Sequence, residues 1–118
     1  MRVIVCGSRS WTDRDRIADR LCDLVLSLPR GTQVTIVHGN AAGADRTAHQ
    51  EAQKHGLFVE PHPADWSIGK RAGPMRNQKM ADLGADLCIA FLKDQSTGTQ
   101  DMIERARKAG IPVDVIHG

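Results

Sequence analysis

The sequence predicts a single α/β domain built on a parallel sheet with helices on both faces. Short β-branched apolar runs alternate with longer amphipathic stretches along the whole chain, which is typical of this fold class. The 118 residues provide enough chain for one domain, spanning 1–118, and no linker, repeat or low-complexity segment divides them. Only 3% of the residues are aromatic, so the core must be aliphatic.

The first half of the chain predicts three strands and two helices. The apolar run 2–6 ends at Gly7, as expected of a strand buried on both faces. Apolar residues at helical spacing then predict an amphipathic helix that Thr12 caps and Pro29 ends. The remaining elements expected in this half are a strand at 34–37, a helix at 43–55 and a short strand at 57–60.

The second half predicts two helices and two strands after a long loop. The segment 62–73 has no clear period and is interpreted as that loop. Pro74 fits the first turn of the next helix, and Thr99 is the expected cap of the last one. The elements expected here are a helix at 74–83, a strand at 86–92, a helix ended by Gly110 and an edge strand at 111–116.

This alternation predicts a Rossmann-like domain whose five parallel strands follow the order 3-2-1-4-5. Parallel strands need crossover helices, and these cover both faces of the sheet. In such a sheet, ligands bind outside the carboxyl ends of the strands, where the winding direction switches. The candidate site is therefore expected in the loops that follow the strands.

Charge and cysteine content exclude several classes of protein. Sixteen basic and 14 acidic residues give a net charge of +2, which is too balanced for a general nucleic-acid or membrane-surface protein. The three cysteines show no metal-ligand spacing, so we expect no metal site and no bound cofactor. Free cysteines, the lack of a signal-like start and the lack of a transmembrane run predict a cytoplasmic protein.

Glycines and polar residues gather where the predicted strands end, and each has a use in binding an anion or a base. Glycines at helix starts let backbone N–H groups approach a phosphate, and Ser or Arg side chains can bind the same anion. Lys79, about a turn from Arg76, could reach it too, and a Trp could stack on a base. The candidate ligand-binding residues are Gly7, Ser8, Arg9, Trp11, His38, Gly39, Gly43, Asp45, Asp65, Trp66, Arg71, Arg76, Asn77, Gly98 and Thr99.

Simpler interpretations of these residues remain open. Any one of the glycines could serve only as a strand-to-helix turn. Asp45 and Asp101 could be ordinary acids of a first helical turn, and Trp11 could simply cover a helix start. Neither a Walker pattern nor the GxGxxG dinucleotide fingerprint is present.

Five motifs taken together resemble the YspA-like branch of the SLOG superfamily, which also contains the Smf/DprA proteins and the Lonely Guy phosphoribohydrolases. The resemblance covers nearly the whole chain and implies a Rossmann-like fold, a nucleotide or nucleotide-derived ligand, and self-association. The motifs are Gly7-Ser8-Arg9-x-Trp11-x-Asp13, His38-Gly39-x-Ala41-x-Gly43-Ala44-Asp45, Pro63-Ala64-Asp65-Trp66, Ala72-Gly73-Pro74-x-Arg76-Asn77-x-x-Met80 and Gly98-Thr99.

The same resemblance implies a catalytic pair for the case that the chain is an enzyme. Lonely Guy enzymes cleave the N-glycosidic bond of nucleoside 5′-monophosphates with an Arg of an Arg-Lys-x-x-Met helix and a Glu after Pro-Gly-Gly-x-Gly-Thr. The matching residues here are Arg76, to hold the phosphate, and Asp101, to stabilise positive charge or activate water. The Pro-Gly-Gly is missing, Asp stands for Glu, and Asn77 stands for the Lys.

These departures favour binding over hydrolysis. The expected function is a sensor, carrier or sequestering module for a nucleotide or nucleotide-derived small molecule, in a chain that forms a homo-oligomer. The alternative is a phosphoribohydrolase that uses Arg76 and Asp101. Single-stranded DNA binding, by analogy with Smf/DprA, is a third hypothesis, against which the near-neutral charge and the lack of a basic helix argue.

Overall fold

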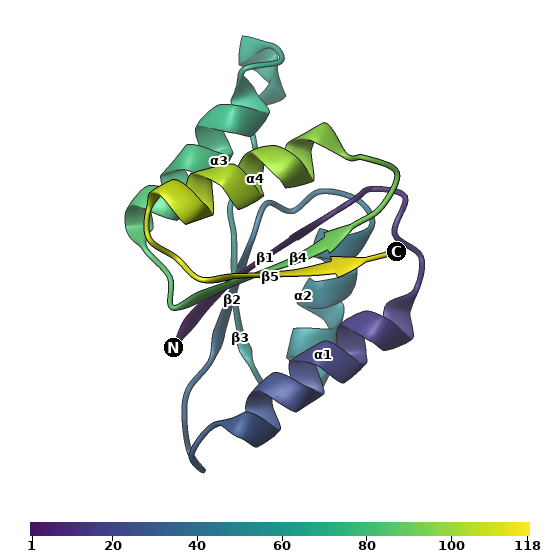
Figure 1. The fold of residues 1–118 in the computed structure, drawn as a ribbon, viewed down its shortest axis with the longest axis vertical. Helices are drawn as coiled ribbons and strands as arrows, with labels where there is room; N and C mark the ends of the chain where they lie inside the picture. Colours follow the sequence, from purple (N-terminus) through teal and green to yellow (C-terminus); the bar gives the residue numbers. More distant parts are fainter.

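The computed structural model describes residues 1–118 as one α/β domain with a five-stranded sheet in which every strand pair is parallel. The strand order is β3-β2-β1-β4-β5, which confirms the predicted order 3-2-1-4-5. Figure 1 shows the strands fanned by the twist of the sheet. The strands are β1 (Arg2–Gly7), β2 (Thr35–His38), β3 (Phe58–Pro61), β4 (Leu87–Leu92) and β5 (Val113–His117).

Helices cover both faces of the sheet, as predicted (Figure 1). One face carries α1 (Arg14–Ser27) and α2 (Ala44–Lys54), and the other carries α3 (Ala72–Leu83) and α4 (Thr97–Lys108). None of these helices is both long and apolar enough to cross a membrane.

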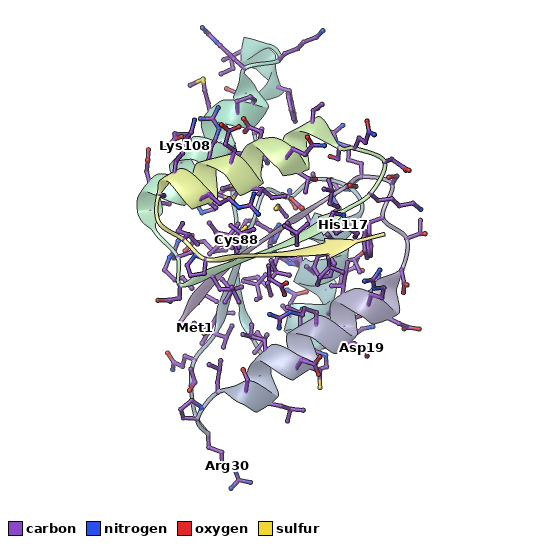
Figure 2. The ribbon with its side chains drawn as sticks, viewed as in Figure 1. Met1, Asp19, Arg30, Cys88, Lys108 and His117 are labelled. Carbon is purple, nitrogen blue, oxygen red and sulfur yellow. The ribbon has the colours of Figure 1, made fainter.

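Two aliphatic cores follow from the alternation of side chains along the central strands. Val3 and Val5 of β1 point into the core beneath α1 and α2, whereas Ile4 and Cys6 point into the core beneath α3 and α4. Cys88 lies in this second core, and Figure 2 shows it inside the molecule, with Asp19, Arg30 and Lys108 outside. Both faces of β1 are therefore buried, which explains its uninterrupted apolar sequence.

The predicted helix caps are displaced by one to three residues. Asp13, not Thr12, caps α1, and its Oδ1 accepts the N–H of Arg16 at 3.2 Å. Ser96, not Thr99, caps α4 by accepting the N–H of Thr99 at 3.4 Å. Thr, Asp and Ser can all cap a helix, and in both cases two such residues stand within three positions of each other. The local sequence therefore does not decide which of the two is the cap.

The predicted loop 62–73 is partly helical. A short 3₁₀ helix, η1 (Trp66–Ile68), interrupts it, and α3 begins at Ala72, two residues before Pro74. At the other end of the chain, β5 begins at Val113 rather than at residue 111. The segment at η1 and the start of α3 projects beyond the sheet, at the top of Figure 1.

Two glycines provide a matched test of packing at the end of β1. A Cβ on Gly7 would overlap the Cβ of Ala44 and lie 2.9 Å from the carbonyl of Phe91, whereas a Cβ on Gly98 would meet nothing within 4 Å. We therefore expect Gly7→Ala to lower the free energy of unfolding by about 1–3 kcal/mol, the usual cost of overpacking. Gly98→Ala, in a helix, should raise it by up to about 1 kcal/mol. Denaturant titrations measure both, and an equal effect of the two substitutions would contradict this account.

Candidate functional site

A cavity of about 720 Å³ opens at the carboxyl ends of β1 and β4, where the winding of the sheet switches. Its walls are the loops after these strands, the starts of α3 and α4, and η1. This volume is within the range of small-molecule sites. The residues predicted from sequence that line it are Gly7, Ser8, Arg9, Asp45, Trp66, Arg76, Asn77, Asp101, Gly98 and Thr99.

Ser8 joins the loops that form the cavity. Its hydroxyl donates to the carbonyl of Lys93 and accepts the N–H of the same residue, both at 2.7 Å. Its backbone carbonyl accepts the N–H of Ala44, at the start of α2, at 3.3 Å. The hydroxyl predicted to bind an anion is thus already used by the main chain, and the role of Ser8 here is structural.

Asp45, near the start of α2, is a buried acid that faces the cavity and holds the loop after β2. Its Oδ2 accepts the N–H of Gly39 at 3.0 Å and of Ala41 at 3.4 Å. Burial raises the pKa of Asp45 to about 6, although the two N–H groups and the nearby Arg76 act in the opposite direction. The carboxyl is therefore close to half-protonated in weakly acidic solution.

Arg76 of α3 lines the cavity and donates only to uncharged groups. Its Nε donates to Asn77 Oδ1 at 2.9 Å, and its Nη1 donates to the carbonyls of Gly39 and His62. Gly39 has no Cβ, and a Cβ there would overlap this guanidinium. Burial lowers the pKa of Arg76, but a guanidinium still keeps its charge at neutral pH. Its Nη2 has no protein partner.

Asp101 of α4 is held on the opposite side of Asn77. Its Oδ2 accepts the side-chain amide of Asn77 at 3.0 Å and Nε of Arg105 at 2.9 Å. Burial raises the pKa of Asp101, but the bonds from Arg105 and Asn77 outweigh it, so the pKa lies below its usual value. Asp101 is consequently a carboxylate at neutral pH, and its Oδ1 remains without a protein donor.

Three further cations line the cavity, and none of them forms an ion pair. They are Arg9 after β1, Lys70 after η1 and Lys93 after β4. The guanidinium of Arg9 lies 5.7 Å from the ring centre of Trp66, which is half exposed at the rim. The first turn of α4 adds backbone N–H groups without intrahelical acceptors.

The floor of the cavity is apolar and rich in sulfur. Cys6, Met80 and Met102 line it, and each is at least nine-tenths buried. The contact with the thiol of Cys88 and burial raise the pKa of Cys6 well above its usual value. Cys6 is therefore a neutral thiol rather than a nucleophile, and this floor belongs to the hydrophobic core beneath the cavity.

Six candidate residues lie outside the cavity. Gly39 instead makes room for Arg76. At Gly43, φ is 79°, and a Cβ would lie 2.5 Å from the carbonyl oxygen of Arg9. The other four are Trp11, His38, Asp65 and Arg71.

These four have structural or solvent-exposed positions. Trp11 is buried against Phe91, with ring centres 5.2 Å apart, so it cannot stack on a ligand. His38 is fully buried, bonded to His49 at 2.8 Å, and burial lowers its pKa to about 4. Asp65 caps η1, and Arg71 is exposed outside the cavity.

Sequence reasoning missed several residues of the site. Lys93 follows β4 directly, so the rule that placed the other candidates after strands could have found it. Arg105, which holds Asp101, looked like part of an exposed helix face and gave no signal. Lys79 is exposed and lies outside the cavity, so it does not reach the anion position expected for it beside Arg76.

The buried acid Asp45 predicts a specific pH dependence of stability. Because its pKa is about 6 in the folded chain and ordinarily 3.8, the folded state holds this proton more tightly than the unfolded state. Its stabilisation is complete below pH 3.8 and is lost as the pH rises through about 6, in total about 3 kcal/mol.

Asp45→Asn should remove this dependence and keep an oxygen for the two N–H groups. Denaturant titrations from pH 4 to 7 would measure the difference in unfolding free energy between the native chain and the variant. That difference cancels the titration of His38 and other groups common to both chains. A difference that does not vary with pH would show that Asp45 ionises normally.

Comparison with known proteins identifies the family to which the chain belongs. The family model described as YspA, cpYpsA-related SLOG family matches residues 1–69. The chain is also similar to the Gene 61 protein of Mycobacterium phage D29, with 44% identity over 118 residues that cover 95% of this chain and 93% of the phage protein. No solved structure matches it significantly. The chain therefore belongs to the YspA, cpYpsA-related SLOG family.

Proposed function

We propose that the chain binds a nucleotide or nucleotide-derived ligand in the cavity, as a sensor, carrier or sequestering module. One observation carries this proposal. Of the half-buried arginines, Arg2, Arg20 and Arg105 each pair with a carboxylate, and Arg76 does not. A partly desolvated guanidinium with a free Nη2 is suited to an anionic ligand, most of all to a phosphate.

The charges around Arg76 support an anion rather than a cation. Two of the three acids of the cavity are less available than its cations: Asp101 is paired with Arg105, and Asp45 is buried with a raised pKa. Only Asp94, exposed at the rim, is an unpaired acid. By contrast, Arg9, Lys70 and Lys93 are unpaired, and the N-terminus of α4 adds to their field. The cavity therefore offers more positive than negative charge to a ligand.

The rest of the cavity fits a sugar and a base. Trp66 presents a half-exposed indole at the rim, on which a base can stack. The free Oδ1 of Asp101 can accept a sugar hydroxyl. A phosphate bound at Arg76 and a base near Trp66 would both lie within this cavity.

A thermal-stability screen tests the proposal. The chain is heated with a panel of nucleoside mono-, di- and triphosphates, dinucleotides and cyclic nucleotides, and each mixture is then separated by chromatography. A ligand at about a hundred times its dissociation constant adds about 2.7 kcal/mol, which is a visible shift in Tm. A shift with the ligand recovered intact supports the binding module. No shift with any member of the panel contradicts the nucleotide proposal.

Arg76→Gln is expected to weaken binding of the best ligand by roughly ten- to hundredfold, because a charge-assisted pair of hydrogen bonds is lost. Lys79→Gln is the matched control, since it removes one positive charge from the same helix outside the cavity. Titration calorimetry measures both dissociation constants. Equal weakening by the two variants would mean that Arg76 acts only through long-range charge.

The position of Asp101 favours hydrolysis of an N-glycosidic bond as a second candidate function. Asn77 links this carboxylate to Arg76, so an acid that can stabilise positive charge on a sugar lies one residue from the phosphate-binding cation. Its lowered pKa makes it a stabilising or water-activating carboxylate rather than a general acid.

If the chain is an enzyme, chromatography will show free base and ribose phosphate, and Asp101→Asn should abolish their formation while preserving the thermal shift. If the chain only binds its ligand, the ligand stays intact with the native chain and with the Asp101→Asn variant. Loss of the thermal shift in Asp101→Asn would instead show that Asp101 is needed for binding.

A further inference from the structure

We propose that the outer edge of β5, together with α4 above it, binds a second copy of this chain about a twofold axis. The two sheets then join into one through antiparallel pairing of β5 with the partner's β5. This interface is separate from the cavity and does not depend on the proposed ligand. In Figure 1, β5 lies at the front of the molecule, and no other element crosses its outer edge.

The two edges of the sheet differ in their capacity to pair. At β3, Phe58 and His62 donate their N–H groups inward to β2, so Val59 and Pro61 face outward. Pro61 has no N–H, and it blocks continued pairing along this edge. The β3 edge is therefore protected against another strand.

The β5 edge carries no such block. Cys88 donates to the carbonyl of Pro112, and Gly118 donates to the carbonyl of Leu92, so the even-numbered residues face β4. The backbone groups of Val113, Val115 and His117 consequently face outward. Only the carbonyl of His117 is engaged, by Nη1 of Arg16 at 2.6 Å. The N–H groups of all three residues and the carbonyls of both valines have no protein partner.

Pairing centred on Val115 satisfies these groups without opposing like charges. Val115 then lies opposite the partner's Val115, and Val113 lies opposite the partner's His117. On the other face of the sheet, Asp114 lies opposite the partner's Ile116, so the two Asp114 carboxylates do not meet. Val113 and His117 are also the two ends of β5, so this register uses the whole strand.

The surface above β5 is complementary to itself. A groove of about 560 Å³ separates β5 from α4, with Leu92, Ile103 and Val115 as its apolar residues. Glu104 and Arg107 line the same groove from α4, and Glu104 also forms an exposed ion pair with Lys108 of its own helix at 3.1 Å. An exposed pair of this kind contributes little and leaves Glu104 able to pair across an interface. A twofold axis perpendicular to the sheet sets the two α4 helices antiparallel, which brings Glu104 toward the partner's Arg107 and Arg107 toward the partner's Glu104. A surface bearing one acid and one base in this order suits a second copy better than an unrelated strand.

The ligand cavities stay open in such a dimer. Antiparallel pairing directs the carboxyl ends of the two sheets to opposite ends of the assembly. Each cavity lies at the carboxyl ends of its own strands, so neither copy covers the cavity of the other. Dimer formation and ligand binding can therefore be measured independently.

Charge reversal at the groove tests the interface. Sedimentation at micromolar to millimolar concentrations should show a dimer for the native chain. Glu104→Arg and Arg107→Glu should each raise the dimer dissociation constant by at least about tenfold, because each homodimer opposes like charges. The double variant E104R/R107E should restore dimerisation, and so should an equimolar mixture of the two single variants.

Arg46→Glu, an exposed charge reversal on α2, is the control and should leave dimerisation unchanged. Hydrogen exchange gives a second measurement that needs no variant: the N–H groups of Val113, Val115 and His117 should be protected in the dimer and lose protection on dilution. A native chain that remains a monomer overturns the proposal. The proposal is also overturned if the charge reversals leave the dimer dissociation constant unchanged, or if these three N–H groups are unprotected in the dimer.

Discussion

The hydrogen bonds of Ser8 hold together the loops after β1 and β4 and the start of α2, which form one side of the cavity. Its side chain closes a ring with the main chain of Lys93, its N–H donates to Phe91 at the end of β4, and its carbonyl accepts Ala44 from α2. Because Ser8 is only 1% exposed, loss of its hydroxyl would leave buried main-chain groups unpaired. Gly43 completes the junction, since only a residue without a Cβ allows α2 to begin so close to the loop after β1.

This main-chain junction leaves the charged side chains free for other uses. The loops after β1 and β4 and the start of α2 meet through carbonyls, N–H groups and the Ser8 hydroxyl, and no ion pair joins them. The ion pair at the cavity, between Asp101 and Arg105, lies within α4, and other ion pairs join elements elsewhere, as between Arg14 of α1 and Glu51 of α2. Because the loops do not depend on ion pairs, Arg76 can remain without a carboxylate partner while the domain stays stable.

The fold was predictable because its determinants are local. Apolar runs buried on both faces predicted the strands, and the strand order followed from right-handed crossovers with one switch of direction. The roles of the two tryptophans could not be predicted from the neighbouring sequence. Trp11 and Trp66 each lie in a loop after a strand, and only the packing of Phe91 and the chain end at Gly118 against Trp11 assigns it to the core. Sequence reasoning therefore located the loops correctly and could not say which side chains turn inward.

The free charge at Arg76 was harder still to predict, because it depends on where every nearby carboxylate is engaged. Asp45 adjoins Arg76 in space, yet its oxygen is occupied by the N–H groups of a loop. Asp101, which the motif pairs with Arg76, is bonded to Arg105 and reaches Arg76 only through Asn77. Most of these bonds join residues within six positions of each other, and only the bond from Asn77 to Asp101 joins distant segments. Several acceptors compete for each donor, and the residue types alone do not say which pairs form. A motif can place an arginine beside a strand end, but only the folded chain shows that its charge is left for a ligand.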